Sequence, residues 1–190
     1  MVDLSKLGQP FVYMKVGTHA NEPLKEIIER KTREIERAGY AMWGYGGNTC
    51  HPLTMMRPFA KSYEQRGGII YLCMEEMNSN NFADQIRAEQ YSIDQSTWQD
   101  IHPDVNVLGS RFALVIKNLR QEEFDVSLDS TRVALGRSAG MIGSKYIAGR
   151  VDKGCLEVFK DPGDRPGNTK HIRLVADIVD PYAVLLRNKS

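Results

Sequence analysis

The chain has 190 residues, of which 42% are hydrophobic and 26% are charged, and this composition is typical of a folded globular protein rather than a disordered one. The 25 basic and 24 acidic side chains nearly cancel, which argues against a protein that holds long nucleic acid mainly through its phosphates. No apolar run approaches the length of about 18 residues that a membrane span needs. We expect a single domain over residues 1–190.

The start of the chain predicts a strand followed by a helix. Residues 11–17 are rich in β-branched and aromatic types and end at a glycine, as a strand does. Apolar residues then recur at helical spacing, with Asn21 expected to cap the helix and Gly39 to end it. The polar face of this helix predicts two i,i+4 ion pairs, Glu26 with Arg30 and Glu29 with Arg33.

The middle of the chain predicts a short strand, a helix and a buried strand, in that order. The short strand is expected over residues 40–43, the helix over 53–65 and the apolar, fully covered strand over 69–74. Residues 78–81 are predicted to form a polar loop. Residues 83–93 fit a helix and a strand equally well.

Strands dominate the second half of the chain. They are expected over residues 111–116, 155–159, 172–178 and 182–186, with a charged turn at 117–123 and an exposed loop at 161–168. Residues 135–150 contain four glycines, and the sequence predicts neither a helix nor a strand there. Because helices come first and strands later, we predict an α+β fold with a curved mixed β-sheet or small barrel flanked by helices.

The segment 42–52, MWGYGGNTCHP, is the strongest candidate site. Trp43 and Tyr45 are two residues apart, so they point the same way if the chain is extended, and their rings could stack on a base. The backbone N–H groups of Gly46, Gly47, Asn48 and Thr49 could meet an anion, especially if Thr49 caps the following helix. The alternative is a tryptophan packed in the core beside a tight turn.

A second candidate centre is Cys50 with His51. A thiol near a helix N-terminus has a lowered pKa and could act as a nucleophile, whereas His51 could donate a hydrogen bond to a ligand. Adjacent residues rarely point into one site, so a buried cysteine and a structural histidine are the alternative, and we assign no catalytic residue. The three cysteines and four histidines show no metal-ligand spacing, and we predict neither a metal nor a cofactor.

A glycine-rich segment at residues 132–153 holds five basic residues against one acidic residue. Glycine and serine beside arginine and lysine fit a loop that binds phosphate, and Arg137 and Lys145 are its candidate ligand-binding residues. A solvated basic face is the alternative interpretation.

The middle of the chain resembles the PUA-like superfamily, which includes the EVE, ASCH and YTH domains. The resemblance covers roughly residues 68–119 and is carried by the strand at 68–74, the segment 83–91, the loop at Trp98 and the strand at 111–116. Similar domains have a compact curved sheet with helices around it, and bind nucleotides, often modified bases, in an aromatic-lined pocket. The ASCH signature G-x-K-x-x-E-x-R is absent, and no functional residue is carried over from the family.

These observations predict a non-enzymatic domain that binds a nucleotide or a base of a nucleic acid. Its expected ligand-binding residues are Trp43, Tyr45, Gly46, Gly47, Asn48, Thr49, His51, Arg137 and Lys145. One alternative is a small hydrolase or transferase that acts on a nucleotide-like substrate through Cys50 or His51. Another is a self-associating protein, so a homo-oligomer stays open. We expect a cytoplasmic protein without a membrane partner.

Overall fold

A computed structural model describes residues 1–64, 68–80, 84–149 and 151–189. Nine strands of this part of the chain form one sheet: β1 (Pro10–Thr18), β2 (Ala41–Tyr45), β3 (Ile70–Asn80), β4 (Gln90–Ser92), β5 (Gln99–Asp100), β6 (Phe112–Ser127), β7 (Thr131–Val133), β8 (Lys153–Val158) and β9 (Thr169–Arg187). The helices are α1 (Leu24–Ala38), α2 (Arg57–Glu64), which continues a π-helical turn (Pro52–Met56), and α3 (Gly143–Tyr146). A 3-10 turn (Leu128–Ser130) links β6 to β7.

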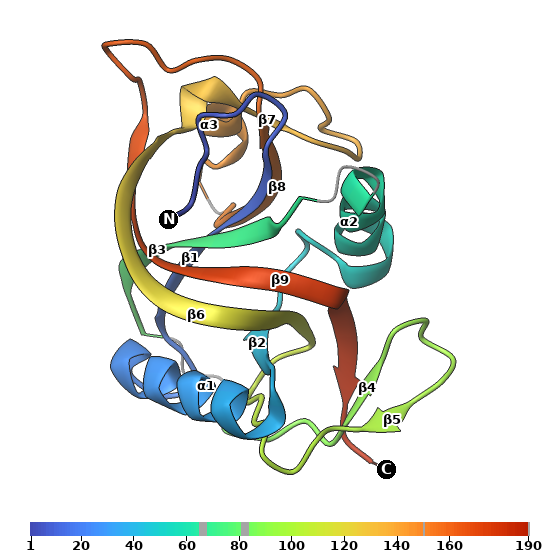
Figure 1. Ribbon diagram of the computed structural model, residues 1–190. Coiled ribbons are helices and arrows are strands. Elements are labelled where there is room, and N and C mark those ends of the chain that lie inside the picture. The colour runs from blue at the N-terminus through green and yellow to red at the C-terminus, as the bar shows by residue number, and fades with distance from the viewer. Residues whose placement is uncertain (65–67, 81–83, 150, 190) are drawn as a thin grey trace.

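The sheet is strongly curved, mixed and open (Figure 1). Its strand order is β2-β6-β9-β3-β1-β8-β7, with β4 and β5 attached beside β9. Strands β1 and β3 run parallel, whereas the other described pairings are antiparallel. The fold is therefore α+β, as predicted, and of the two predicted forms the described residues show the curved mixed sheet, because β2 and β7 end its path.

Helix α1 ends where the sequence predicts but begins differently. Gly39 adopts a left-handed φ of 84° and its N–H donates to the Ile35 carbonyl, which closes the last turn. Pro23 occupies the N-cap position without a side-chain cap, so the prediction that Asn21 caps the helix is wrong. Instead, Asn21 has a positive φ of 60° and belongs to the turn before the helix.

The two ion pairs predicted for α1 are absent from the described residues. Arg30 turns inward to Glu22, at 2.5 Å, and to Glu34, at 3.0 Å, rather than outward to Glu26. A carboxylate in this partly buried setting attracts a guanidinium more strongly than a solvated one, which accounts for the difference.

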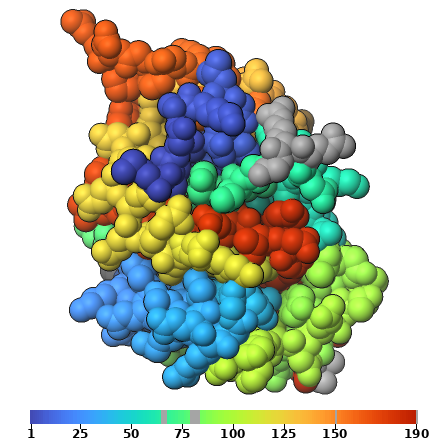
Figure 2. Space-filling view, in the orientation of Figure 1, coloured from blue at the N-terminus to red at the C-terminus, as the bar shows by residue number. Residues whose placement is uncertain are grey.

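Strands β6 and β9 are long, curved and paired with one another along most of their length, and they lie side by side across the face shown in Figure 2. The charged turn predicted at residues 117–123 is wrong, because this stretch continues β6. Register shifts next to Lys117 and Gln121 bend the strand and let its charged side chains reach solvent. The two strands predicted at 172–178 and 182–186 are parts of β9.

The structure shifts, corrects or types the other elements of the first half and of residues 135–150. The predicted helix at 53–65 corresponds to the π-helical turn and α2, with residue 65 outside the described residues. The polar loop predicted at 78–81 is wrong for 78–80, which belong to β3 with Asn80 opposite Thr18 of β1, and residue 81 is not described. The ambiguous stretch 83–93 contains β4, and the untyped stretch 135–150 contains α3, with residues 83 and 150 outside the described ones.

Helices α1 and α2 pack on the same side of the sheet. Alternate residues of β1 divide between two apolar clusters, with Val12 and Met14 on the side of the helices and Phe11 and Tyr13 on the other. Ile27 of α1 and Phe59 of α2 belong to the same cluster as Val12. None of the described helices has both the length and the apolar character that a membrane span requires.

Candidate functional site

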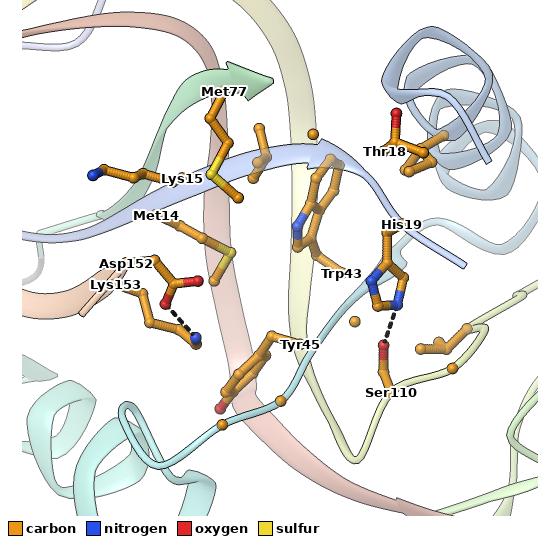
Figure 3. Close-up of a pocket in the computed structure, with 18 of the residues that line it drawn as sticks. Met14, Lys15, Thr18, His19, Trp43, Tyr45, Met77, Ser110, Asp152 and Lys153 are labelled. Atoms are coloured by element: carbon orange, nitrogen blue, oxygen red, sulfur yellow. Dashed lines mark hydrogen bonds and ion pairs between the residues drawn. The ribbon is translucent and has the colours of Figure 1, made fainter. Parts of the chain in front are cut away.

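A pocket of about 620 Å³ opens where the carboxyl ends of β1 and β2 meet the start of α1 (Figure 3). The loop at residues 107–110 and the start of β8 complete its wall. Small-molecule sites commonly have volumes of roughly 300–1,000 Å³, so the pocket has room for a ligand of nucleotide size.

Trp43 and Tyr45 lie on the same side of β2, as their spacing predicts, and both line the pocket. Each is only 5% exposed, because the rings also belong to the core under α1 and α2. The Tyr45 hydroxyl donates to the Cys50 carbonyl, and its ring lies 5.5 Å from that of Phe112. Only a small part of either ring is therefore open to the pocket, which leaves little ring face for the stacking that the sequence suggested.

The Trp43 indole nitrogen is a hydrogen-bond donor without a partner among the described residues. Ser130 Oγ alone is a fully buried, unpartnered side-chain polar atom in this part of the chain, so the Trp43 nitrogen reaches an accessible surface. Figure 3 places that nitrogen on the edge of the ring nearer to Met14, inside the pocket wall. An unpartnered donor that reaches the surface of a pocket can donate to a ligand that accepts from it.

The loop from Gly46 to Thr49 lines one end of the pocket. Within the described ranges its four backbone N–H groups have no hydrogen-bond acceptor, and Gly47 has a left-handed φ of 84°. Thr49 does not cap the next helix, because His51 is the N-cap residue and its Nδ1 accepts from the Leu53 N–H at 3.2 Å. The loop amides thus stay available, while the helix does not contribute its N-terminus.

Lys153 lies at the same end of the pocket. Its ammonium donates to Asp152 Oδ1 at 2.8 Å, and a methyl group added to Gly47 would lie 3.6 Å from Lys153 Nζ. Lys153 is 7% exposed, whereas the Asp152 side chain is 43% exposed at the rim. The antiparallel pairing of Lys153 with Met14 brings this cation to the pocket from a distant part of the sequence.

His19 and Ser110 lie at the opposite end. His19 Nε2 is 3.0 Å from the Leu108 carbonyl and 3.2 Å from Ser110 Oγ. A carbonyl only accepts, so Nε2 carries the hydrogen in the neutral ring, and Ser110 also donates to Leu108. The other nitrogen, Nδ1, is then an acceptor without a partner among the described residues, and it lies on the side of the ring nearer to Trp43 (Figure 3).

A buried ion pair under the pocket holds the 107–110 loop through Asn106. Lys31 and Glu34 are both 2% exposed and lie 3.1 Å apart. Glu34 accepts from the Asn106 N–H at 3.0 Å, and Lys31 donates to the Asn106 carbonyl. Burial lowers the pKa of Lys31 to about 8, against the opposing effect of Glu34.

Six of the nine residues predicted for ligand binding line this pocket, namely Trp43, Tyr45, Gly46, Gly47, Asn48 and Thr49. His51 is outside it, with its ring 5.0 Å from Phe112, and Arg137 and Lys145 are exposed elsewhere. The positions of these three residues therefore do not support a role for them in binding a ligand in this pocket. Sequence reasoning missed Lys153 and His19 as pocket residues, although Lys153 belongs to the basic segment already noted.

Cys50, the candidate nucleophile, does not line the pocket either. Its thiol is buried and lies 3.8 Å from the Cys155 thiol. Within the part of the chain that the structure describes, no group of three His, Cys, Asp or Glu side chains is arranged to hold a metal ion.

Comparison of the chain with protein-family models, with curated proteins and with solved structures found no match in any of the three. The chemistry of the pocket is therefore interpreted from its own geometry.

Proposed function

We propose that the pocket binds a nucleotide, either free or presented as a base by a nucleic acid, and that the protein acts by binding rather than by catalysis. The observation that carries this proposal is the convergence, on one cavity of suitable size, of residues that have hydrogen-bond donors to spare. Trp43, the loop residues 46–49 and Lys153 all line it, and the Trp43 N–H and the four loop amides have no partner among the described residues.

The donors and acceptors of the pocket match the edge of a base. Ring nitrogens and carbonyl oxygens of bases accept hydrogen bonds, and the Trp43 N–H can donate to either. Exocyclic amino groups donate, and His19 Nδ1 can accept from one. Recognition through hydrogen bonds agrees with the small exposed fraction of Trp43.

The arrangement gives little support to the enzymatic alternative. Cys50 is buried beside Cys155, away from the pocket. His19 Nε2 already has a carbonyl acceptor, so it is not free to take the Ser110 proton as a general base does. We also propose that the chain is related to the PUA-like superfamily. The curved mixed sheet and the aromatic residues in the pocket lining support this relationship.

Binding is tested by calorimetric titration of the common nucleosides and their 5′-monophosphates. Met77 lines the pocket from β3 and is half-buried, so Met77→Trp should fill the cavity and abolish binding. Met141→Trp is the matched control, because Met141 is 42% exposed and outside the pocket. Wild-type protein that binds no compound of the panel would overturn the proposal.

A further inference from the structure

We infer that Lys153 and the loop from Gly46 to Thr49 form the subsite for the phosphate group of the ligand. This inference rests on the proposed function and assigns one end of the same pocket. It names Lys153 as a binding residue, in place of the exposed Arg137 and Lys145.

The count of free donors supports a phosphate at this end. The four loop N–H groups have no acceptor within the described residues. An ammonium has three hydrogens, and Lys153 uses one with Asp152, which leaves two for a ligand. Phosphate oxygens each accept several hydrogen bonds, and charge-assisted bonds of this kind are stronger than neutral ones.

The charges around the pocket single out Lys153. Arg30 and Lys31 also line the cavity, but their charges are compensated by Glu22 and Glu34. Lys15 lines it as well, and Figure 3 shows its ammonium directed away from Trp43.

Among the described residues that line the pocket, Asp152 alone is acidic. Its side chain is much more exposed than that of Lys153, so water screens the carboxylate more than the ammonium. The net field at this end of the pocket therefore favours an anion.

The two ends of the pocket then fix the direction of the ligand. Lys153 and the glycine loop lie on one side of Trp43, and the His19–Ser110 pair lies on the other (Figure 3). A nucleotide with its phosphate at Lys153 would direct the rest of the molecule past Trp43 toward the His19–Ser110 end. The phosphate could be the terminal group of a free nucleotide or a diester within a nucleic acid.

The test compares each common ribonucleoside with its 5′-monophosphate by calorimetric titration of the full chain. We expect the monophosphate to bind about tenfold more tightly or better, since hydrogen bonds to charged groups exceed neutral ones. Lys153→Gln should remove most of this advantage, so that the nucleoside and its monophosphate bind this variant with similar affinity. Lys160→Gln, at an exposed lysine outside the pocket, is the control and should bind as wild type does.

The wild-type ratio decides the inference even if the Lys153 variant folds poorly. Equal affinity for nucleoside and monophosphate would overturn the phosphate subsite and leave the proposed function standing. Failure of both to bind would overturn the proposed function itself. If a dinucleoside monophosphate binds as tightly as the monophosphate, the subsite accepts a phosphodiester of a nucleic acid. If it binds more weakly, the subsite accepts the terminal phosphate of a free nucleotide.

Discussion

Gly44 of β2 and Ser110 touch with no space for a side chain between them. A Cβ on Gly44 would overlap Ser110 Oγ and lie 2.8 Å from Val107 Cγ1. This close approach presses the 107–110 loop against β2 and leaves Ser110 within 3.2 Å of His19 Nε2. The absence of a side chain at position 44 therefore sets one end of the pocket.

Gly44→Ala should destabilise the protein by about 1–3 kcal/mol, because the added methyl group forces the loop away from β2. Gly46→Ala is the matched control, since a Cβ there meets nothing within 4 Å and its backbone is not left-handed. Urea unfolding followed by circular dichroism measures both. Equal stability of the two variants would show that the loop does not depend on this contact.

The buried Lys31–Glu34 pair should respond unequally to loss of its two members. Glu34→Gln removes the carboxylate shared by Lys31, Arg30 and the Asn106 N–H, and should cost about 3–5 kcal/mol. Lys31→Met leaves Glu34 with Arg30 and Asn106, so its loss should be clearly smaller. Denaturant midpoints give the order, and a reversed order would contradict this account of the network.

Lys31 should also make stability depend on alkaline pH. Its pKa is lowered to about 8 in the folded protein by burial, whereas an unfolded lysine keeps its proton to about pH 10.4. Between these values the unfolded chain binds more protons, so the free energy of unfolding rises with pH through this group. The difference in that free energy between wild type and Lys31→Met should grow from about pH 8 to 10. A constant difference, or one that shrinks, would contradict the lowered pKa.

The three cysteines should be unreactive in the folded protein. Cys50, Cys73 and Cys155 are all buried, and burial raises the pKa of Cys73 well above its ordinary value. Titration with Ellman's reagent should therefore detect no rapidly reacting thiol in native protein and three thiols after unfolding. A fast reaction at Cys50, identified by its loss in Cys50→Ser, would restore the case for a nucleophile.

The sequence predicts correctly those features that depend only on residues close together in the chain. Gly39 ends α1 because a left-handed residue is needed there, and the alternation of β2 brings Trp43 and Tyr45 to one side. The charged residues 117–123 predict a turn because charge usually marks exposed loops. In the structure the same charges belong to an exposed part of the long strand β6, whose register shifts carry it around the fold.

The pocket as a whole could not be predicted, because its residues meet only through long-range pairings. Lys153 reaches the cavity through the antiparallel register of β8 with Met14 of β1. His19 and Ser110 are brought together by the contact of the 107–110 loop with Gly44. No spacing within the sequence predicts these contacts between distant residues. For the same reason the sequence does not distinguish Lys153 from Arg137 and Lys145, which belong to the same basic segment.

The central claim, that the Trp43 edge faces the ligand, is tested most directly by the indole N–H signals in a ¹H–¹⁵N NMR spectrum. The chain has two tryptophans, so two such signals are expected, and Trp98→Phe assigns them. Trp98 serves as an internal reference, since it lies outside the pocket with the Arg187 guanidinium 4.1 Å from its ring.

Titration with a nucleoside monophosphate that binds should shift the Trp43 signal and leave the Trp98 signal in place. Saturation of the protein with the Trp43 signal unmoved would contradict the account, because the ligand would then occupy another part of the surface.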